Sequence, residues 1–374
     1  MSSPNSRKFI PVVNLKPCLE AAGEACGARL RELFARAQFI LGEQGETFER
    51  EFARAIGARE SVGVGSGTAA IELCLRDAGV MRRNQEVITS ALTAPFTGVA
   101  IRAAGCHLKL ADVNPETLLL DAGDVANRAT KRTAAIIPVH LYGQPAELTP
   151  FRKLARELGA ALIQDACQAH GARHRGKPLT AYSPYVAYSF YPTKNLGCLG
   201  DGGAVATDSA ARAKRLRSMR DGGRRGGQVA YAPGINSRLD EIQACYLRAF
   251  LPLLAEWNAM RAETAALYRE GLKDCAGVRL VKTSAESVHH LFVVRASKRE
   301  KLRTWLAERG IGTGVHYPVP LHLMPAFAEA GLKRGDLPHA ERAAREVTSL
   351  PLWPYLKRED ALEVIGRVRE FYRK

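Results

Sequence analysis

The stretch that decides the fold is residues 134–165, AAIIPVHLYGQPAELTPFRKLARELGAALIQD. It opens with an apolar run that has the length of a buried strand, followed by a turn. Thr149 then predicts a helix N-cap, Pro150 suits the first helical position, and Gly159 ends the helix. A second apolar run brings Asp165 to the end of a strand. We therefore expect a strand–helix–strand crossover of a parallel sheet, with Asp165 at the edge where such sheets bind ligands.

The same alternation of helix and strand patterns extends to about residue 250, which predicts an α/β domain over residues 1–250. A helical stretch over 239–272, with Pro252 as a kink, crosses this boundary. Beyond it the pattern changes, and we expect a smaller α+β domain over residues 251–374. Its predicted elements are a strand at 290–294, a helix at 298–309, a short strand in TGVHYP (313–318) and a terminal helix at 358–372.

Composition excludes several classes of protein. The 374 residues are 46% hydrophobic and 25% charged, which is typical of globular chains and not of disordered ones. Apolar runs are far shorter than the ~20 residues of a membrane helix, and no signal-peptide pattern is present at the start. Eight scattered cysteines without a CxxC pair predict reduced thiols and neither a metal cluster nor a disulfide framework. We expect a cytoplasmic protein without a membrane partner.

The net charge of +16 has three interpretations: a nucleic-acid partner, a small anionic ligand, or a basic solvated surface. Basic residues are dispersed over many predicted helices, and aromatic residues do not alternate with them as in a single-strand binding surface. We therefore favour the solvated surface and expect no nucleic-acid partner.

Three segments carry candidate chemistry. In GVGSGTAAIELCL (63–75) an apolar run ends in Gly67 and Thr68 and opens into a helix, whose N-terminal amides can hold a phosphate. In LIQDACQAHGA (162–172) a strand ends at Asp165, and in YSFYPTKNLGCLGDGGAVATD (188–208) Lys194 precedes a glycine-rich turn. Taken singly, the three segments are better explained as an ordinary N-cap, a turn-capping carboxylate and a solvated lysine.

The combination of the three segments predicts a pyridoxal phosphate site. The amine of Lys194 forms a Schiff base with the cofactor aldehyde, and the carboxylate of Asp165 pairs with the pyridinium nitrogen. The helix N-terminus and Ser189 then hold the phosphate.

Several long motifs extend this hypothesis over essentially the whole chain. They are SGTAA (66–70), PVHLYGQPAEL (138–148), QDACQAHGA (164–172), SFYPTKNLGCLGDGGAV (189–205), GINSRLDEIQA (234–244) and TGVHYPVPLHL (313–323). The chain resembles the DegT/DnrJ/EryC1/StrS family of sugar aminotransferases. The resemblance implies the fold-type I architecture: a large domain with a mostly parallel, seven-stranded sheet between helices, and a smaller C-terminal α+β domain.

The resemblance also implies roles for single residues. Lys194 would carry the internal aldimine and act as general acid and base, and Asp165 would be the pyridinium partner. Gln168 would lie near the phenolic oxygen of the cofactor. Ser189 and the backbone amides of Gly67 and Thr68 would bind the phosphate. Asn236 would reach the phosphate in the site of the neighbouring subunit. The resemblance thus implies a homodimer with shared active sites.

Two positions depart from the family pattern or qualify it. In TSALTAPFTGVAI (89–101) Ala94 aligns with an aromatic residue that covers the cofactor ring, while Phe96 follows two residues later. Either Phe96 covers the ring or stacking is weaker. Family branches that replace the lysine with histidine run dehydrations, so Lys194 favours transamination.

Substrate contacts are assigned to His316 and Tyr317 in the HYP motif, and to Arg224 in the glycine-rich, basic loop 219–234, which we expect to be mobile. We expect transfer of an amino group, from glutamate, to a ketosugar linked to a nucleotide diphosphate. The alternatives are a related enzyme acting on an aminocyclitol or another cyclic ketone, a sensor that retains the cofactor, and a nucleic-acid-binding protein.

Overall fold

The computed structural model describes residues 9–373 of the chain. Its central strands are β1 (Glu60–Val64), β2 (Glu86–Ser90), β3 (His107–Ala111), β4 (Thr133–Ile137), β5 (Ala161–Leu162), β6 (Gln164–Asp165), β9 (Val186–Ser189) and β10 (Gly203–Thr207). They form two four-stranded groups with the orders β3-β2-β4-β5 and β1-β10-β9-β6. A parallel bridge between Val139 and Asp165 joins the groups, and β5 and β6 occupy one strand position interrupted at Ile163.

Parallel pairing dominates this layer, as the sequence predicts. The exception is β10, which runs antiparallel to both β1 and β9. The pairs β2–β3, β2–β4, β4–β5 and β6–β9 are all parallel. The predicted α/β fold with a mostly parallel sheet is therefore confirmed, and the carboxyl ends of β4, β6 and β9 share one edge.

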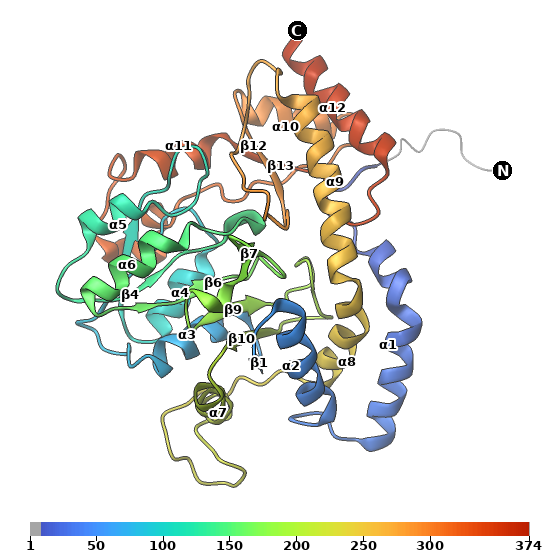
Figure 1. The fold of residues 1–374 in the computed structure, drawn as a ribbon. Helices are drawn as coiled ribbons and strands as arrows, with labels where there is room; N and C mark the ends of the chain where they lie inside the picture. The colour runs from blue at the N-terminus through green and yellow to red at the C-terminus, as the bar shows by residue number, and fades with distance from the viewer. Residues whose placement is uncertain (1–8, 374) are drawn as a thin grey trace.

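Helices cover both faces of the sheet (Figure 1). The helices of this part of the chain are α1 (Lys16–Arg36), α2 (Glu43–Ile56), α3 (Gly67–Asp77), α4 (Pro95–Ala103), α5 (Ala122–Arg128), α6 (Leu148–Leu158), α7 (Ala210–Met219) and α8 (Glu241–Phe250). Strand β9 shows why both faces are apolar: Ala187 belongs to the core shared with α3, α4 and α6, whereas Val186 and Tyr188 belong to the core shared with α2 and α8. Alternate side chains of one strand thus enter opposite cores.

The C-terminal part has its own antiparallel sheet, with the order β11 (Val278–Leu280), β12 (Phe292–Ala296), β13 (Val347–Leu350). Helices α9 (Leu254–Leu272), α10 (Arg299–Ala307) and α12 (Arg358–Arg373) pack on it in a third core. Helix α11 (Pro338–Glu346) instead contributes to the core of the large sheet. The division at residue 250 stays a prediction.

Several predicted boundaries are confirmed and others shift. The long helical stretch breaks at Pro252, in the short 3-10 helix η3 (Leu251–Leu253), and the terminal helix is found as predicted. The predicted cap at Thr149 is wrong. Helix α6 begins at Leu148 with Glu147 as its N-cap, because the Glu147 carboxylate accepts from the backbone N–H of Thr149 at 3.4 Å and complements the helix dipole.

The predicted strand in TGVHYP is also wrong, because only Gly314 pairs there, as an isolated bridge to Ser349. Pro318 and Pro320 lack the N–H groups that a longer ladder would need. This segment is therefore free to cross toward the carboxyl edge of the large sheet.

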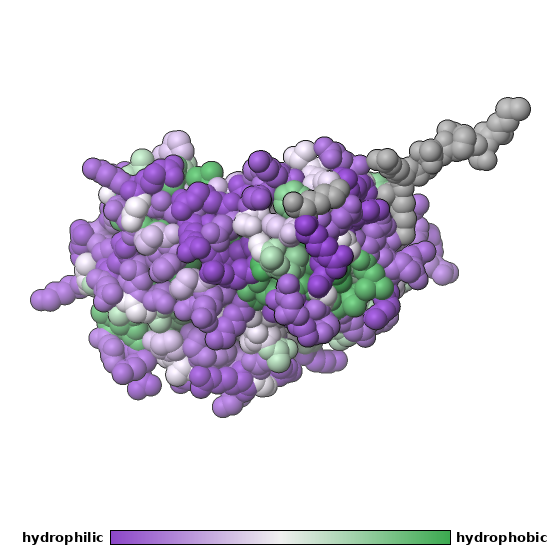
Figure 2. Space-filling view, turned by 90° about the horizontal axis from the view of Figure 1, so that it is seen from above, coloured by the Kyte–Doolittle hydropathy of each residue, from purple (hydrophilic) through white to green (hydrophobic). Residues whose placement is uncertain are grey.

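The surface agrees with the basic, polar composition. Figure 2 shows a mostly hydrophilic face in which smaller hydrophobic patches lie between hydrophilic residues. Among residues 9–373 no helix is both long and apolar enough to span a membrane.

Candidate active site

The predicted residues converge at the carboxyl edge of the large sheet. Asp165 ends β6, Ser189 ends the neighbouring strand β9, and Gly67 begins α3 beside them. A Cβ atom added to Gly67 would lie 2.7 Å from the Cβ of Ser189 and 2.7 Å from the Sγ of Cys167. The backbone at the start of α3 therefore approaches both strand ends more closely than any other residue type allows.

This close approach forms a cradle for an anion. Ser66 caps α3, and its hydroxyl oxygen accepts from the N–H of Ala69 at 3.1 Å. The amides of Gly67 and Thr68 lie in the first turn, where a helix supplies no carbonyl partner. With the hydroxyl of Ser189 nearby, these donors fit a phosphate group.

Asp165 is buried, with 5% of its surface exposed. Its Oδ2 accepts from the Thr97 hydroxyl at 2.7 Å, and its Oδ1 accepts from the backbone N–H of Cys167 at 3.1 Å. Within residues 9–373 it forms no ion pair. A buried carboxylate with neutral donors only leaves room for a cationic N–H, which is what a protonated pyridine nitrogen offers.

Lys194 lies in the loop after β9, and its backbone N–H bonds to the carbonyl of Tyr191 at 2.8 Å. The side chain is half-buried and carries no ion pair within the described part of the chain. Burial lowers the pKa of Lys194, while the nearby Cys167 and Asp165 act in the opposite direction. A lysine of lowered pKa has a larger fraction of neutral, nucleophilic amine.

Gln168 is held in one orientation by two tyrosines. Its Oε1 accepts from the backbone N–H of Tyr142 at 2.7 Å, and its Nε2 donates to the hydroxyl of Tyr317 at 3.1 Å. The hydroxyl of Tyr142 in turn donates to the carbonyl of His316. The HYP segment thus reaches the same edge as Gln168, from a position 149 residues further along the chain.

Three imidazoles lie close enough to Lys194 for its charge to act on them: His170 and His290, which are buried, and His316, which is half-buried. Burial, followed by the charge of Lys194, lowers the pKa of His170 to about 3 and of His316 to about 4. The pKa of His290 is lowered well below its usual value for the same two reasons. These rings are therefore neutral near pH 7, so they add no positive charge beside Lys194, on which the carboxylate of Asp165 also acts.

Not every predicted residue joins this group. Arg224 lies in the loop that Figure 1 shows projecting below α7, where its guanidinium pairs with Asp221 at 2.6 Å. Asn236 is exposed and lines a groove with Ser66 and Thr68 on the outer side of the cradle. In the single chain both residues therefore lie outside the group around Asp165 and Lys194.

The two candidates for covering the cofactor ring lie at the start of α4. Ala94 is its half-buried N-cap, and Phe96 is 62% exposed. Phe96 therefore has no packing that would hold its ring over the site in the single chain, whereas its neighbour Thr97 is buried against Asp165.

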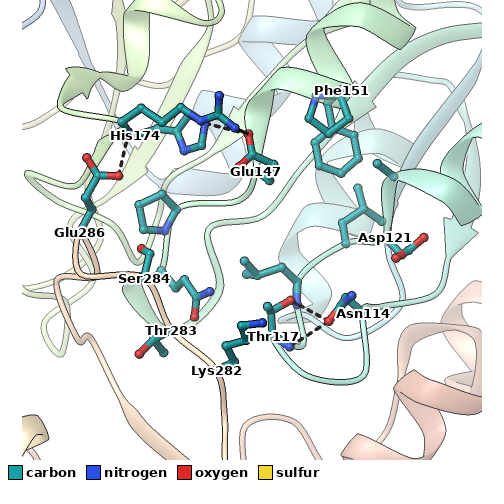
Figure 3. A pocket seen from close by; sticks show the side chains of 17 residues that line it. Asn114, Thr117, Asp121, Glu147, Phe151, His174, Lys282, Thr283, Ser284 and Glu286 are labelled. Atoms are coloured by element: carbon teal, nitrogen blue, oxygen red, sulfur yellow. Dashed lines mark hydrogen bonds and ion pairs between the residues drawn. The ribbon is translucent and has the colours of Figure 1, made fainter.

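A separate cleft of about 560 Å³ lies beyond β3 and β4 (Figure 3). Its wall includes the carboxylate of Glu147, which contacts His174 Nε2 and Arg175 Nη2, both at 3.1 Å. None of the predicted site residues lines it. Asp165 and Lys194 lie away from this cleft, at the carboxyl edge of the sheet.

The sequence reasoning missed Thr97, Tyr142, Asn195 and His290. The sequence holds a signal for three of them. Thr97 lies two residues after the helix-starting Pro95, Asn195 follows Lys194, and His290 lies just before β12. Only their packing shows that they touch the site.

Solved structures with this fold identify the class. S. venezuelae DesV, solved in complex with a ketimine intermediate, is 42% identical and superposes with a TM-score of 0.95 over 98% of this chain and 99% of that one. NtdA from Bacillus subtilis, solved with bound cofactor PMP, is 27% identical with a TM-score of 0.91 over 99% and 87% of the two chains. The fold and the site define an aminotransferase.

The family follows from the sequence match. The model of the DegT/DnrJ/EryC1/StrS aminotransferase family matches residues 21–369, and the chain belongs to this family. A relative from Streptomyces venezuelae, a dTDP-3-amino-3,4,6-trideoxy-alpha-D-glucose transaminase, is 42% identical over 99% of this chain and 98% of its own length. The resemblance drawn from the motifs is confirmed.

Proposed function

We propose that this enzyme uses pyridoxal phosphate to move an amino group from glutamate to a ketosugar carried on a nucleotide diphosphate. We further propose carbon 3 of the sugar as the acceptor, because the relative from Streptomyces venezuelae carries a 3-amino sugar in its name. One observation carries the proposal: a buried carboxylate without an ion pair, Asp165, next to a lysine of lowered pKa, Lys194, beside an anion cradle.

The residues of the site fit this cofactor. Gly67, Thr68 and Ser189 would hold its phosphate, and Gln168, fixed by Tyr142 and Tyr317, would present an amide to the ring. When bound, pyridoxal phosphate supplies an aldehyde that takes up an amino group and a ring that withdraws electrons from the substrate carbon.

The chain itself would supply charge and proton transfer. Asp165, oriented by the Thr97 hydroxyl and the Cys167 amide, holds a proton on the ring nitrogen. Lys194, neutral for part of the time because burial lowers its pKa, takes a proton from the substrate carbon and returns it. The neutral imidazoles near Lys194 give its amine polar neighbours in addition to water.

The test separates the two half-reactions. Purified protein with pyridoxal phosphate should change its visible absorbance on addition of glutamate and recover it on addition of a nucleotide-linked 3-ketosugar. Lys194→Ala should lower both rates by roughly 10³-fold or more, with Lys282→Ala, an exposed lysine paired to Glu116, as the control. Full transamination by Lys194→Ala would refute the mechanism. Recovery with cyclitol ketones instead of sugars would redirect the substrate assignment.

We also propose a homodimer with shared active sites. Supporting it, apolar side chains near α4 and the Lys194 loop are left uncovered in the single chain: Phe96 (62% exposed), Tyr191 (52%) and Leu199 (52%). Asn236 is exposed and faces outward at the groove by the cradle. Both observations suit a second copy that covers the site and lends Asn236 to it.

Mixing two inactive variants tests the sharing of sites. Lys194→Ala and Asn236→Ala, refolded or co-expressed together, should regain about a quarter of wild-type activity, because half of the dimers are mixed and each mixed dimer has one complete site. Absence of any regain, with mixed dimers shown by mass spectrometry, would place Asn236 on its own subunit's site or outside it.

A further inference from the structure

His290 is held in a single orientation by a network of buried amides. The Nδ2 of Asn195, the residue after Lys194, donates to the carbonyl of Val288 and to Asn258 Oδ1, both at 2.8 Å. Because Nδ2 faces two carbonyl oxygens, the Oδ1 of Asn195 is free to accept from His290 Nδ1 at 3.1 Å. The proton of the neutral ring therefore sits on Nδ1, and Nε2 keeps a bare lone pair.

The backbone around His290 is equally constrained. The N–H of Val288 donates to the carbonyl of Gly143 at 2.9 Å, and a Cβ added to Gly143 would lie 2.6 Å from the backbone nitrogen of His290. Gly143 has a φ of +88°, so glycine suits both the conformation and the close contact. The backbone that carries His290 is therefore held in place next to Tyr142, one of the two tyrosines that hold Gln168.

The lone pair of His290 faces space that the protein does not fill. Nε2 has no hydrogen-bond partner among residues 9–373, yet it is not sealed in the core as the Nδ1 of His170 is. The Nζ of Lys194 has no partner in the same part of the chain and is likewise not sealed. The charge of Lys194 acts on His290, and no direct hydrogen bond joins the two side chains, so Nε2 is free to accept from a substrate group near the lysine.

We propose that His290 is a specificity-determining residue whose Nε2 accepts a hydrogen bond from a hydroxyl of the acceptor sugar, on a carbon next to the reacting carbonyl. A neutral imidazole with its proton on Nδ1 offers only an acceptor at Nε2. Sugars carry hydroxyl donors, whereas the carboxylates of glutamate are acceptors and its amino group is the one that the cofactor takes up, so glutamate brings no further donor to Nε2. His290 therefore serves the sugar half-reaction and not the amino-donor half-reaction. This inference rests on the proposed function.

Two matched variants separate the nitrogens of the ring. In His290→Asn the side-chain amide can still donate to Asn195, but nothing reaches the position of Nε2. In His290→Gln an oxygen can occupy the position of Nε2, while the bond to Asn195 is lost. His339→Asn, at an exposed histidine, is the control.

Single-turnover absorbance should show the same rate of the donor half-reaction with glutamate in the two variants, because each replaces the neutral imidazole near Lys194 with a neutral amide. In the sugar half-reaction, His290→Asn should raise the apparent Kd for a dTDP-linked 3-ketosugar by roughly threefold to tenfold, and His290→Gln should stay close to wild type. Removing the neighbouring hydroxyl from the sugar should weaken binding to wild type and leave binding to His290→Asn unchanged. Calorimetry of the cofactor-free variants with the same sugar nucleotide gives the affinity without turnover.

Other outcomes overturn the inference. If His290→Gln is as impaired as His290→Asn, or if both half-reactions fall together, His290 supports the fold around Lys194 and does not select the sugar. Equal binding of the deoxygenated sugar to wild type has the same consequence. A wild-type protein that responds neither to glutamate nor to the ketosugar would instead refute the proposed function.

Discussion

Thr97 provides the sharpest test of how the site is built. Its hydroxyl donates to Asp165 Oδ2 at 2.7 Å, and the side chain is 1% exposed. Replacing Thr97 with Val retains the shape and removes this donor, so Asp165 keeps only its contacts with the backbone N–H and the thiol of Cys167. Because the carboxylate is buried and has no ion pair in the described part of the chain, loss of the Thr97 hydroxyl leaves its charge less well satisfied.

The size of the effect follows from these contacts. A hydrogen bond to a charged group contributes about 1.5–3 kcal/mol, so Thr97→Val should lower the free energy of unfolding of the cofactor-free protein by about 2 kcal/mol. That change is about 30-fold in the folding equilibrium constant. Thr97→Ser retains the hydroxyl and loses a methyl group, which costs only about 1 kcal/mol.

Urea unfolding of four proteins measures the coupling directly: wild type, Thr97→Val, Asp165→Asn and the double variant. Once position 165 is uncharged, Thr97→Val should cost at least about 1 kcal/mol less than it does in wild type. Additive effects of the two substitutions, or an equal cost for Val and Ser at position 97, would refute the view that Thr97 stabilises the charge of Asp165.

Two further predictions concern the cradle and the buried histidines. Gly67→Ala should lower cofactor affinity at least roughly tenfold and destabilise the protein by about 1–3 kcal/mol, because the added Cβ collides with Ser189. The control is Gly366→Ala, where nothing lies within 4 Å and the change should be neutral or stabilising by up to about 1 kcal/mol. Equal effects at the two glycines in calorimetry would contradict this prediction. Burial lowers the pKa of His140 to about 4, and its Nδ1 accepts from the Ala146 N–H at 2.9 Å. Since the unfolded chain takes up a proton below about pH 6.5 that the folded ring refuses, stability should fall as the pH drops from 6.5 toward 4, by about 2 kcal/mol from this group at pH 5. His140→Gln should flatten that part of the pH profile of urea unfolding, and an unchanged slope would show that other groups carry it.

Local sequence patterns were enough to predict the helices and strands that carry the site residues. The crossover ending at Asp165, the capped helix start at Gly67 and the break at Pro252 all lie where the sequence predicts them. These features depend on periodicity, capping and turn residues within a few positions of one another, and such signals are complete in the chain itself. Even here the N-cap of α6 is Glu147 and not the predicted Thr149, because the Glu147 carboxylate, three residues before Pro150, competes for the N-terminus of the same helix.

Packing alone decided which side chains meet. Thr97 reaches Asp165 across 68 residues of sequence, and Tyr317 reaches Gln168 across 149. The orientation of His290 depends on Asn195 and Asn258, which come from a loop and from α9. The sequence does not show whether a polar residue faces water or a buried partner. Its role becomes visible only when the order of the strands and the crossing segments bring the partner within hydrogen-bond distance. The sequence by itself determined the chemistry available at the edge of the sheet, and the tertiary structure decided how those groups are held, charged and turned toward a substrate.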